Sequence, residues 1–468
     1  MNYFKALRAS TVFMSSVLSI AALSQNVFSI ESDAVDDLAA VTLQEPAVEA
    51  AGFFYERLPR DVRHRVVHHL GAEDARNLRI ALLGSKNQIC LGDGQGERNV
   101  RLLWNEGDDV DRIVESFGRG VKFNSLSINS EFDAERASRL LSHSTIRPHI
   151  RNIHLRYIGY FSIPLDLPNI RNFAVFHMFP NLKEQRVQQF FSGDSCQGIR
   201  TILLSNCGLT AKGVEGISEA ESFNDVNEFN LSNNRISDDG VVAISQCPGL
   251  QRLESLSLSN VRMTGIGFNS LLSSGKLCGL SKLDLSFHGL GDLALLAIVQ
   301  HQGLQGLKNL SFGGNGISAG GCRHIAGSSY MSSLLELNLN GNSIGDEGLK
   351  VLSESKYVTE LRMFSCAGEQ GVTHEGVEMM TNSTNFMKLE SLFLTGNNIG
   401  DAGAFVIAGT ENMPKKRMIS LYDCGIESQG VRALAAFGNE SSKVRICIGV
   451  EDEDLVALNA EYPNANIS

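Results

Sequence analysis

The sequence predicts an α/β horseshoe, a right-handed solenoid with a parallel sheet on its concave face and helices on its convex face, preceded by a small helical segment. Three observations indicate this fold. A short apolar alternation recurs nine times, its period is 27 residues over most of the array, and a glycine followed by apolar residues at helical spacing recurs in most copies. Fixed periods of about 20 to 50 residues are typical of repeat architectures.

The repeats keep one apolar pattern in phase. Six copies share the 27-residue spacing: Ile202-x-Leu204-x-x-Cys207, Phe229-x-Leu231-x-x-Asn234, Leu256-x-Leu258-x-x-Val261, Leu283-x-Leu285-x-x-His288, Leu310-x-Phe312-x-x-Asn315 and Leu337-x-Leu339-x-x-Asn342. Three more follow: Leu361-x-Met363-x-x-Cys366, Leu392-x-Leu394-x-x-Asn397 and Ile419-x-Leu421-x-x-Cys424. We interpret residues 367–371 as an insertion that breaks the period once.

Each part of the pattern has a physical role. The alternation of apolar residues predicts a short strand with one buried face. An Asn side chain after it can bond the backbone of the neighbouring turn, because it carries both donors and an acceptor. A glycine and then apolar residues at helical spacing follow, as in Gly240-x-x-x-Ile244 and Gly348-x-x-x-Leu352. One repeat cannot bury its apolar face alone, whereas stacked repeats can.

This pattern resembles the ribonuclease-inhibitor class of leucine-rich repeats over residues 199–450. The resemblance implies the horseshoe and a ladder of asparagines, which Val261 and His288 should interrupt. Upstream, Leu126-x-Ile128, Ile153-x-Leu155 and Phe173-x-Val175 look like degenerate repeats. We therefore assign residues 91–198 to an N-terminal cap with degenerate repeats, and residues 451–468 to a C-terminal cap.

Residues 53–90 predict short helices before the repeats. Val62, Val66 and Leu70 lie on one helical face, and Pro59 suits a first helical turn. Together with Leu58, these residues resemble the F-box, a motif that docks onto the Skp1 subunit of ubiquitin ligases, although Lys86 stands where that motif usually has an aromatic residue. The resemblance implies that Leu58, Pro59, Val62, Val66 and Leu70 contact a Skp1-like adaptor. The alternative is that the helices only cap the solenoid.

The first residues have the order of a secretory signal peptide. Lys5 and Arg8 precede an apolar run from Thr11 to Leu23, and small residues follow, so we expect residues 1–29 to be removed after Ser24 or Ser29. The alternative is a membrane anchor over Ala9 to Ile30. Residues 30–52 contain six acidic residues and no Lys or Arg, which favours a flexible acidic linker. No later segment is apolar for long enough to cross a membrane.

Composition narrows the function classes. The chain of 468 residues has a net charge of -11 and a pI of about 5.5, which disfavours binding to nucleic acid. The nine cysteines show no paired spacing, so we expect small buried residues rather than disulfides or a zinc site. The glycine-rich stretch from Gly92 to Gly96 and the pair His64 and His68 lack the surroundings of a phosphate or metal site. We expect no catalytic residues, cofactor or metal.

The predicted target site lies on the concave face. Side chains that alternate with the buried ones are small or polar in the early repeats, but their character changes after residue 360. We predict that one exposed patch there binds a protein target, because aromatic residues and Arg dominate interface hot spots. Its members are Arg362, Phe364, Phe393, Thr395 and Tyr422. The alternative is that Phe364 and Phe393 pack on the inserted residues.

These features favour a protein-binding repeat protein that is not an enzyme. The leading hypothesis is a substrate-recognition adaptor of the F-box and leucine-rich-repeat type. Since F-box partners are cytosolic, the signal peptide fits this hypothesis if a bacterium exports the protein into a eukaryotic host cell. The alternative is a plain binding or inhibitor protein, and a GTPase-activating protein is a weaker alternative without a supporting motif. The target and the oligomeric state stay open.

Overall fold

The computed structural model describes residues 88–91, 100–104, 124–129, 134–156, 167–177, 184–191, 198–219, 221–368, 371–440, 444–449 and 452–467. The predicted signal peptide, acidic linker and adaptor-contact residues Leu58, Pro59, Val62, Val66 and Leu70 lie outside these residues. The chain divides into two compact units. The first comprises Met1–Pro180 and Gly193–Gln197, and the second comprises Asn181–Ser192 and Gly198–Ser468.

The first unit contains five described strands. β1 (Gln88–Leu91) is antiparallel to β2 (Val100–Trp104), and β3 (Ser125–Asn129), β4 (Asn152–Arg156) and β5 (Asn172–Phe176) follow in parallel. α7 (Ala134–Ser142) and the short helix η1 (Arg147–His149) connect β3 to β4. Leu126, Ile153 and Phe173 stand in register and are buried, which confirms the strands predicted at these degenerate repeats.

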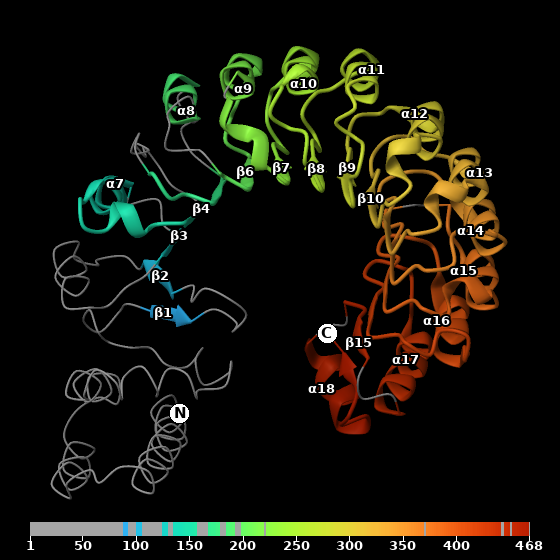
Figure 1. Ribbon diagram of the computed structural model, residues 1–468. Coiled ribbons are helices and arrows are strands. Elements are labelled where there is room, and N and C mark those ends of the chain that lie inside the picture. Colours follow the sequence, from blue (N-terminus) through green and yellow to red (C-terminus); the bar gives the residue numbers. More distant parts are fainter. Residues whose placement is uncertain are drawn as a thin grey trace, which may run out of the picture. The chain divides into compact units, whose positions relative to one another are not determined.

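The second unit is an α/β solenoid, which confirms the predicted fold class. Its strands pair in parallel with their sequence neighbours from β6 to β16, and they lie on the inner side of an arc whose outer side carries the helices (Figure 1). The strands are β6 (Thr201–Ser205), β7 (Glu228–Asn230), β8 (Ser255–Ser257), β9 (Lys282–Asp284), β10 (Asn309–Ser311), β11 (Glu336–Asn338), β12 (Met363–Ser365), β13 (Ser391–Phe393), β14 (Met418–Ser420), β15 (Arg445–Cys447) and β16 (Asn466–Ile467).

Helices alternate with these strands. They are α8 (Glu184–Phe191), α9 (Ala211–Ser218), α10 (Ser237–Gln246), α11 (Gly265–Ser273), α12 (Gly291–Val299), α13 (Ala319–Gly327), α14 (Gly345–Ser353), α15 (His374–Thr381), α16 (Gly400–Gly409), α17 (Ser428–Glu440) and α18 (Asp452–Glu461). Short 3-10 helices are η3 (Glu221–Asp225), η4 (Gln302–Leu304), η5 (Ser329–Met331) and η6 (Thr384–Phe386). Among the described residues, no helix is both long and apolar enough to span a bilayer.

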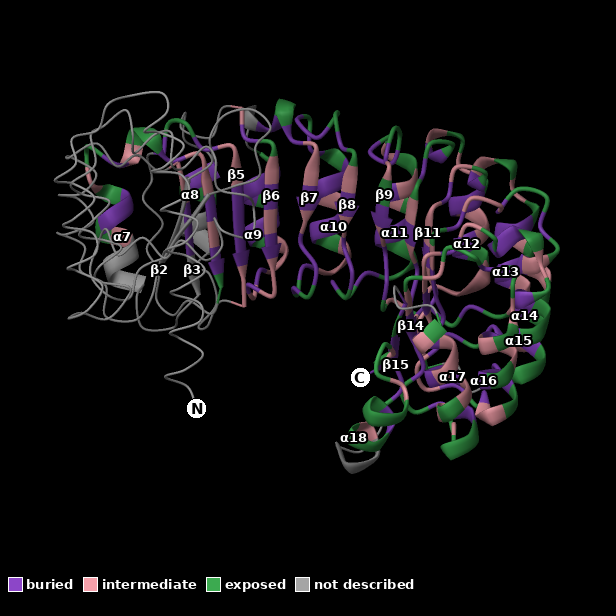
Figure 2. Cartoon of the chain, turned by 90° about the horizontal axis from the view of Figure 1, so that it is seen from below, coloured by how far each residue is buried: buried purple, intermediate pink, exposed green. Residues whose placement is uncertain are grey.

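The core lies between the strands and the helices. Figure 2 shows buried residues along the strands, with exposed residues on outer helices such as α14 and α17. The leucines predicted to be buried are all inaccessible to solvent: Leu204, Leu231, Leu258, Leu285, Leu339 and Leu394. A third buried column stands three residues before the first strand column, and it contains Leu253, Leu280, Leu307, Leu334, Leu361 and Leu389.

Two hydrogen-bonded ladders tie consecutive repeats together. In the first, the amide nitrogen of Asn234 donates to the carbonyl oxygen of Leu204 at 2.6 Å, and Asn315, Asn342 and Asn397 do the same to their preceding repeats. Val261 interrupts this ladder as predicted, since valine has no donor. The prediction that His288 interrupts it is wrong, because the ring of His288 bonds the carbonyl of Leu258.

The second ladder uses aspartates in alternate repeats: Asp238, Asp292, Asp346 and Asp401. Each carboxylate accepts hydrogen bonds at the start of the next helix, from Thr264, Ser318, Thr373 and Glu427 respectively. The aspartate side chain lies so close that an added Cβ at Gly376 would be 2.2 Å from Oδ1 of Asp346. The repeat glycine is therefore required where the neighbouring carboxylate caps the helix.

Candidate functional site

Three rows of side chains cover the concave face of the second unit. In β13 they are the positions of Ser391, Phe393 and Thr395, which alternate with the buried Leu392 and Leu394. Register places Met363 and Met418 beside Ser391, and Ser365 and Ser420 beside Phe393. Phe393 and Thr395 are half-buried, and Tyr422 is 38% exposed. These three residues therefore lie where the sequence predicted them.

The prediction for Phe364 is wrong. Phe364 pairs with Leu337 on one side and Leu392 on the other, so it occupies the first buried column and is inaccessible to solvent. Its ring packs 5.8 Å from the ring of Phe386, centroid to centroid. The sequence pattern was shifted by three residues, because Leu361 belongs to the third buried column and not to the strand. Phe364 is therefore a core residue, and Met363 takes the concave position in β12.

Arg362 is exposed, but it lies just before β12 instead of in a concave row. Cys366 also falls in a different column from the one predicted, since it follows Phe364 as Leu339 follows Leu337. The spacing is 27 residues from Leu337 to Phe364 and 28 from Phe364 to Leu392. The break in period between these strands is thus a single added residue.

The concave face changes character along the second unit. From β7 to β11 its rows are polar, and many of the side chains bond each other. Ser232 and Ser257 are 2.7 Å apart between hydroxyl oxygens, and Asp284 accepts from Ser257 and Ser286. Their hydrogen-bonding groups are largely used within the sheet. This stretch forms a polar surface without large apolar side chains.

From β12 to β14 the rows contain large apolar and aromatic side chains. We call Met363, Phe393, Thr395, Met418 and Tyr422 the C-terminal concave patch. All five are half-buried or exposed, and they lie on three consecutive parallel strands or directly after them. Sequence reasoning missed Met363 and Met418. The recurring Leu three residues before each strand would have set the register and identified both.

Tyr422 is held by its neighbours on the next repeat. An added Cβ at Gly449 would be only 2.7 Å from Cδ1 of Tyr422, so the ring lies directly over that glycine. Beside it, the hydroxyl oxygens of Thr395 and Ser420 are 3.0 Å apart. A half-exposed ring with a fixed position loses little side-chain entropy when a partner covers it.

A row of charged residues borders the patch where the strands begin, and we call it the basic edge. Glu390 lies between two arginines, with 3.8 Å from its Oε1 to a guanidinium nitrogen of Arg362 and 3.6 Å from its Oε2 to Nε of Arg417. Arg445 is exposed on β15. Lys416 does not belong to this edge, because its ammonium group donates to the carbonyls of Ile407 and Thr410, and burial lowers its pKa to about 8.

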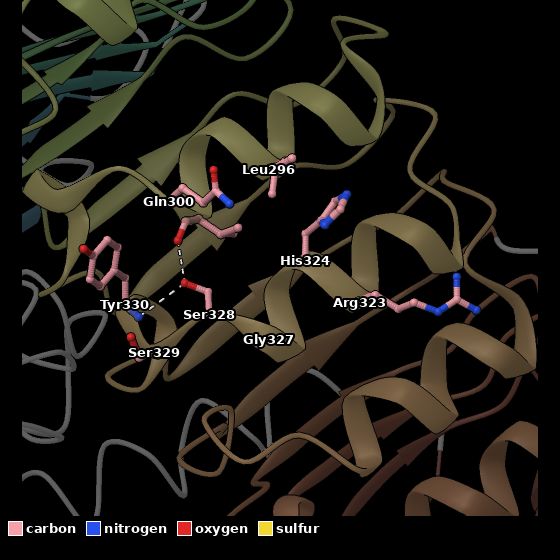
Figure 3. A pocket seen from close by; sticks show the side chains of 9 residues that line it. Leu296, Gln300, Arg323, His324, Gly327, Ser328, Ser329 and Tyr330 are labelled. Atoms are coloured by element: carbon pink, nitrogen blue, oxygen red, sulfur yellow. Dashed lines mark hydrogen bonds between the residues drawn. The ribbon is translucent and has the colours of Figure 1, made fainter.

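A hollow of about 400 Å³ lies on the helical side, between α12 and α13 (Figure 3). An added Cβ at Gly327 would meet nothing within 4 Å, so the missing side chain leaves part of this space. The polar groups around it already have structural partners. The Ser328 hydroxyl donates to the carbonyl of Val299 at 2.5 Å, and Arg323 pairs with Glu347 at 3.1 Å. The hollow therefore ranks below the concave patch as a binding site.

Cysteine and metal chemistry do not add a site in the described part of the chain. Its cysteines are free, and all are buried except Cys278. No group of three or more His, Cys, Asp or Glu side chains in the described ranges could hold a metal ion.

Comparisons with known proteins agree on the repeat. A family model described as leucine-rich repeat matches residues 224–245, 330–353 and 387–408, so the chain contains leucine-rich repeats. No curated protein matches the chain. Among solved structures, an internalin from Listeria monocytogenes is similar, with a TM-score of 0.40 and 18% identity over 71% of this chain and 80% of the internalin chain.

Proposed function

We propose that this leucine-rich repeat protein binds a protein target on the C-terminal concave patch. The observation that carries the proposal is the change along the concave face, from hydrogen-bonded polar rows to Met363, Phe393, Met418 and Tyr422. Aromatic side chains bury large areas and are enriched in interface hot spots. On the described concave face, such side chains gather at β12 to β14.

Binding measurements with matched variants test this proposal. A target captured by cross-linking to the full chain is titrated by calorimetry against the wild type, Phe393→Ala, Tyr422→Ala and Ser311→Ala. The first two variants should lose roughly 2 kcal/mol or more of binding free energy. Ser311 occupies the row of Phe393 on β10, so Ser311→Ala should bind normally. Equal affinity of all four proteins would exclude the patch as the binding site.

A finer proposal concerns the N-terminal segment. The resemblance of Leu58, Pro59, Val62, Val66 and Leu70 to the F-box supports an adaptor that brings its target to a ubiquitin ligase through a Skp1-like subunit. Calorimetry of the chain with purified Skp1 tests this, with Leu70→Asp as the control. Loss of binding in a variant that stays folded would support the adaptor, whereas unfolding of Leu70→Asp would indicate a cap.

The signal-like residues 1–29 support a third proposal, export of the protein to another compartment, with action in a host cell cytosol as one arrangement. N-terminal sequencing of secreted protein tests it. A mature chain beginning at residue 25 or 30 is expected, and an intact Met1 on the secreted form would contradict cleavage.

A further inference from the structure

The basic edge indicates the chemistry of the partner. We propose that the segment held on the C-terminal concave patch is an acidic protein segment, whose carboxylates meet Arg362, Arg417 and Arg445 while an apolar side chain covers Phe393 and Tyr422. This inference rests on the proposed function, because it names the partner class of the same patch.

Charge along the strand beginnings favours this partner. At the first position of each strand and the residue before it, β12 to β15 carry Arg362, Arg417 and Arg445 against Glu390, a net charge of +2. The same positions from β6 to β11 carry three cations, Arg200, Lys282 and Lys308, against three anions, Glu228, Glu254 and Glu336, a net charge of 0. The excess positive charge therefore lies beside the apolar patch, on a chain whose total charge is -11.

The arginines of this edge are available to a ligand. The side chains of Arg362 and Arg417 are 62% and 75% exposed, and they share one carboxylate over distances longer than a direct hydrogen bond. Each guanidinium carries five N–H donors, and a bidentate pair with a carboxylate is the geometry it fits best. Glu390 thus holds the two arginines near the patch while leaving most of their donors free for an incoming carboxylate.

The spacing of the arginines limits the ligand. Arg362 and Arg417 precede strands two positions apart, which places their backbones roughly 10 Å from each other in a parallel sheet. An extended chain advances about 3.3 Å per residue, so two carboxylates about three residues apart can reach both arginines. Arg445 lies one strand further and extends the same row.

Two other anionic partners fit the structure less well. The patch is on the inner side of the arc of strands, which a flat lipid surface cannot approach (Figure 1). Nucleic acid binding needs many phosphate contacts, whereas this edge has three arginines and one of their charges is offset by Glu390. A protein segment meets both the charged edge and the Met and aromatic side chains beside it.

Selection from a random peptide library tests the proposal without a known target. The library is displayed on phage and selected on the full chain, on the double variant Arg362→Glu/Arg417→Glu, and on Lys282→Glu as the matched control. Lys282 is exposed at the first position of β9, outside the patch. Wild type and control should enrich peptides with acidic residues and an apolar anchor, and the double variant should enrich basic ones.

Affinities of one selected peptide then give the size of the effect. Arg417→Glu should weaken binding at least about tenfold, Arg417→Lys should weaken it less, and Glu390→Gln should strengthen it a few-fold, because the competing carboxylate is removed. Thermal melts confirm that each variant is folded. Comparable binding of a 12-nucleotide DNA strand or of phosphatidylserine vesicles would overturn the assignment to a protein segment.

One outcome separates this inference from the proposed function. If the wild type enriches apolar peptides without acidic preference, and Phe393→Ala abolishes their binding, the acidic partner is wrong while the binding patch stands. If Phe393→Ala and the charge variants all bind like the wild type, both proposals fail.

Discussion

The Nε2 atom of His288 lies 2.7 Å from the carbonyl oxygen of Leu258, thirty residues earlier in the chain. Because a carbonyl oxygen only accepts, Nε2 must carry the proton. Asn315 in the next repeat makes the equivalent bond to Leu285 at 2.8 Å, and the Cys424 thiol makes it to Leu394 at 3.2 Å. Three side-chain types thus serve one structural position, which is to satisfy a carbonyl between strands.

His288 should make stability depend on pH. Burial lowers its pKa below the ordinary value of 6.5, although Leu258 and Asp284 act in the opposite direction. The unfolded chain therefore takes up a proton near pH 6.5 that the folded repeat resists, so stability is full above that pH and falls as the pH is lowered. Urea unfolding at pH 7.5 and pH 5.5 measures this. His288→Asn should keep the ladder and reduce the difference between the two pH values; an unchanged difference would assign it to other groups.

The aspartate ladder should contribute to stability through helix capping. Asp346 accepts from the backbone N–H of Thr373 at 2.8 Å and of Gly376 at 3.0 Å, and from the Thr373 hydroxyl at 2.7 Å. Asp346→Ala leaves these donors without their acceptor and should cost about 1 to 3 kcal/mol. Glu347→Ala, at the exposed neighbour, should change the free energy of unfolding by less than about 0.5 kcal/mol. Equal effects in urea unfolding would argue against capping.

Acid should weaken the same ladder. Burial alone would raise the pKa of Asp238, but hydrogen bonds from Thr264 and Gly267 together hold this pKa below its usual value. A carboxyl with a lowered folded pKa stabilises the protein above its unfolded pKa, and that contribution is lost as the pH falls through the folded value. Asp238→Asn should therefore flatten the stability profile below about pH 4. An unchanged slope in acid unfolding would contradict this role.

Phe364 and Phe393 should respond differently to truncation. Phe364 is fully buried against Phe386, so Phe364→Ala opens a cavity and should cost about 3 to 5 kcal/mol. Phe393 is half-buried on the concave face, so Phe393→Ala should cost much less stability while lowering target affinity. Thermal melts of both variants give the comparison, and a larger loss for Phe393→Ala would return this side chain to the core.

Gly449 should position Tyr422. Its φ is +69°, where an added side chain costs about 1 to 2 kcal/mol, and a Cβ would also displace the Tyr422 ring. Gly449→Ala should thus lower both stability and target affinity. Gly425→Ala is the matched control, because its φ is +66° and the nearest atom to its Cβ would be Oδ1 of Asn398 at 3.7 Å. If both variants bind equally well, the ring position is unimportant.

Much of the second unit could be predicted from sequence because each repeat buries the same columns. The strand residues Leu231, Leu258 and Leu285 are recognised by spacing alone, and the structure confirms their burial. The seventh strand could not be placed in this way. Leu361 and Met363 have the same two-residue spacing as a strand pair, and the added residue before β13 removed the 27-residue guide.

The sequence by itself determined the repeat, its parallel sheet and the place where the concave surface changes from polar to aromatic, because these follow from periodic burial within short segments. Only the tertiary structure decided which of residues 361–366 enter the core, since pairing with β11 and β13 fixes that Phe364 points inward and Met363 outward. It also decided the basic edge. Arg362, Glu390 and Arg417 are 28 and 27 residues apart, and the stacking of parallel strands brings their charges together.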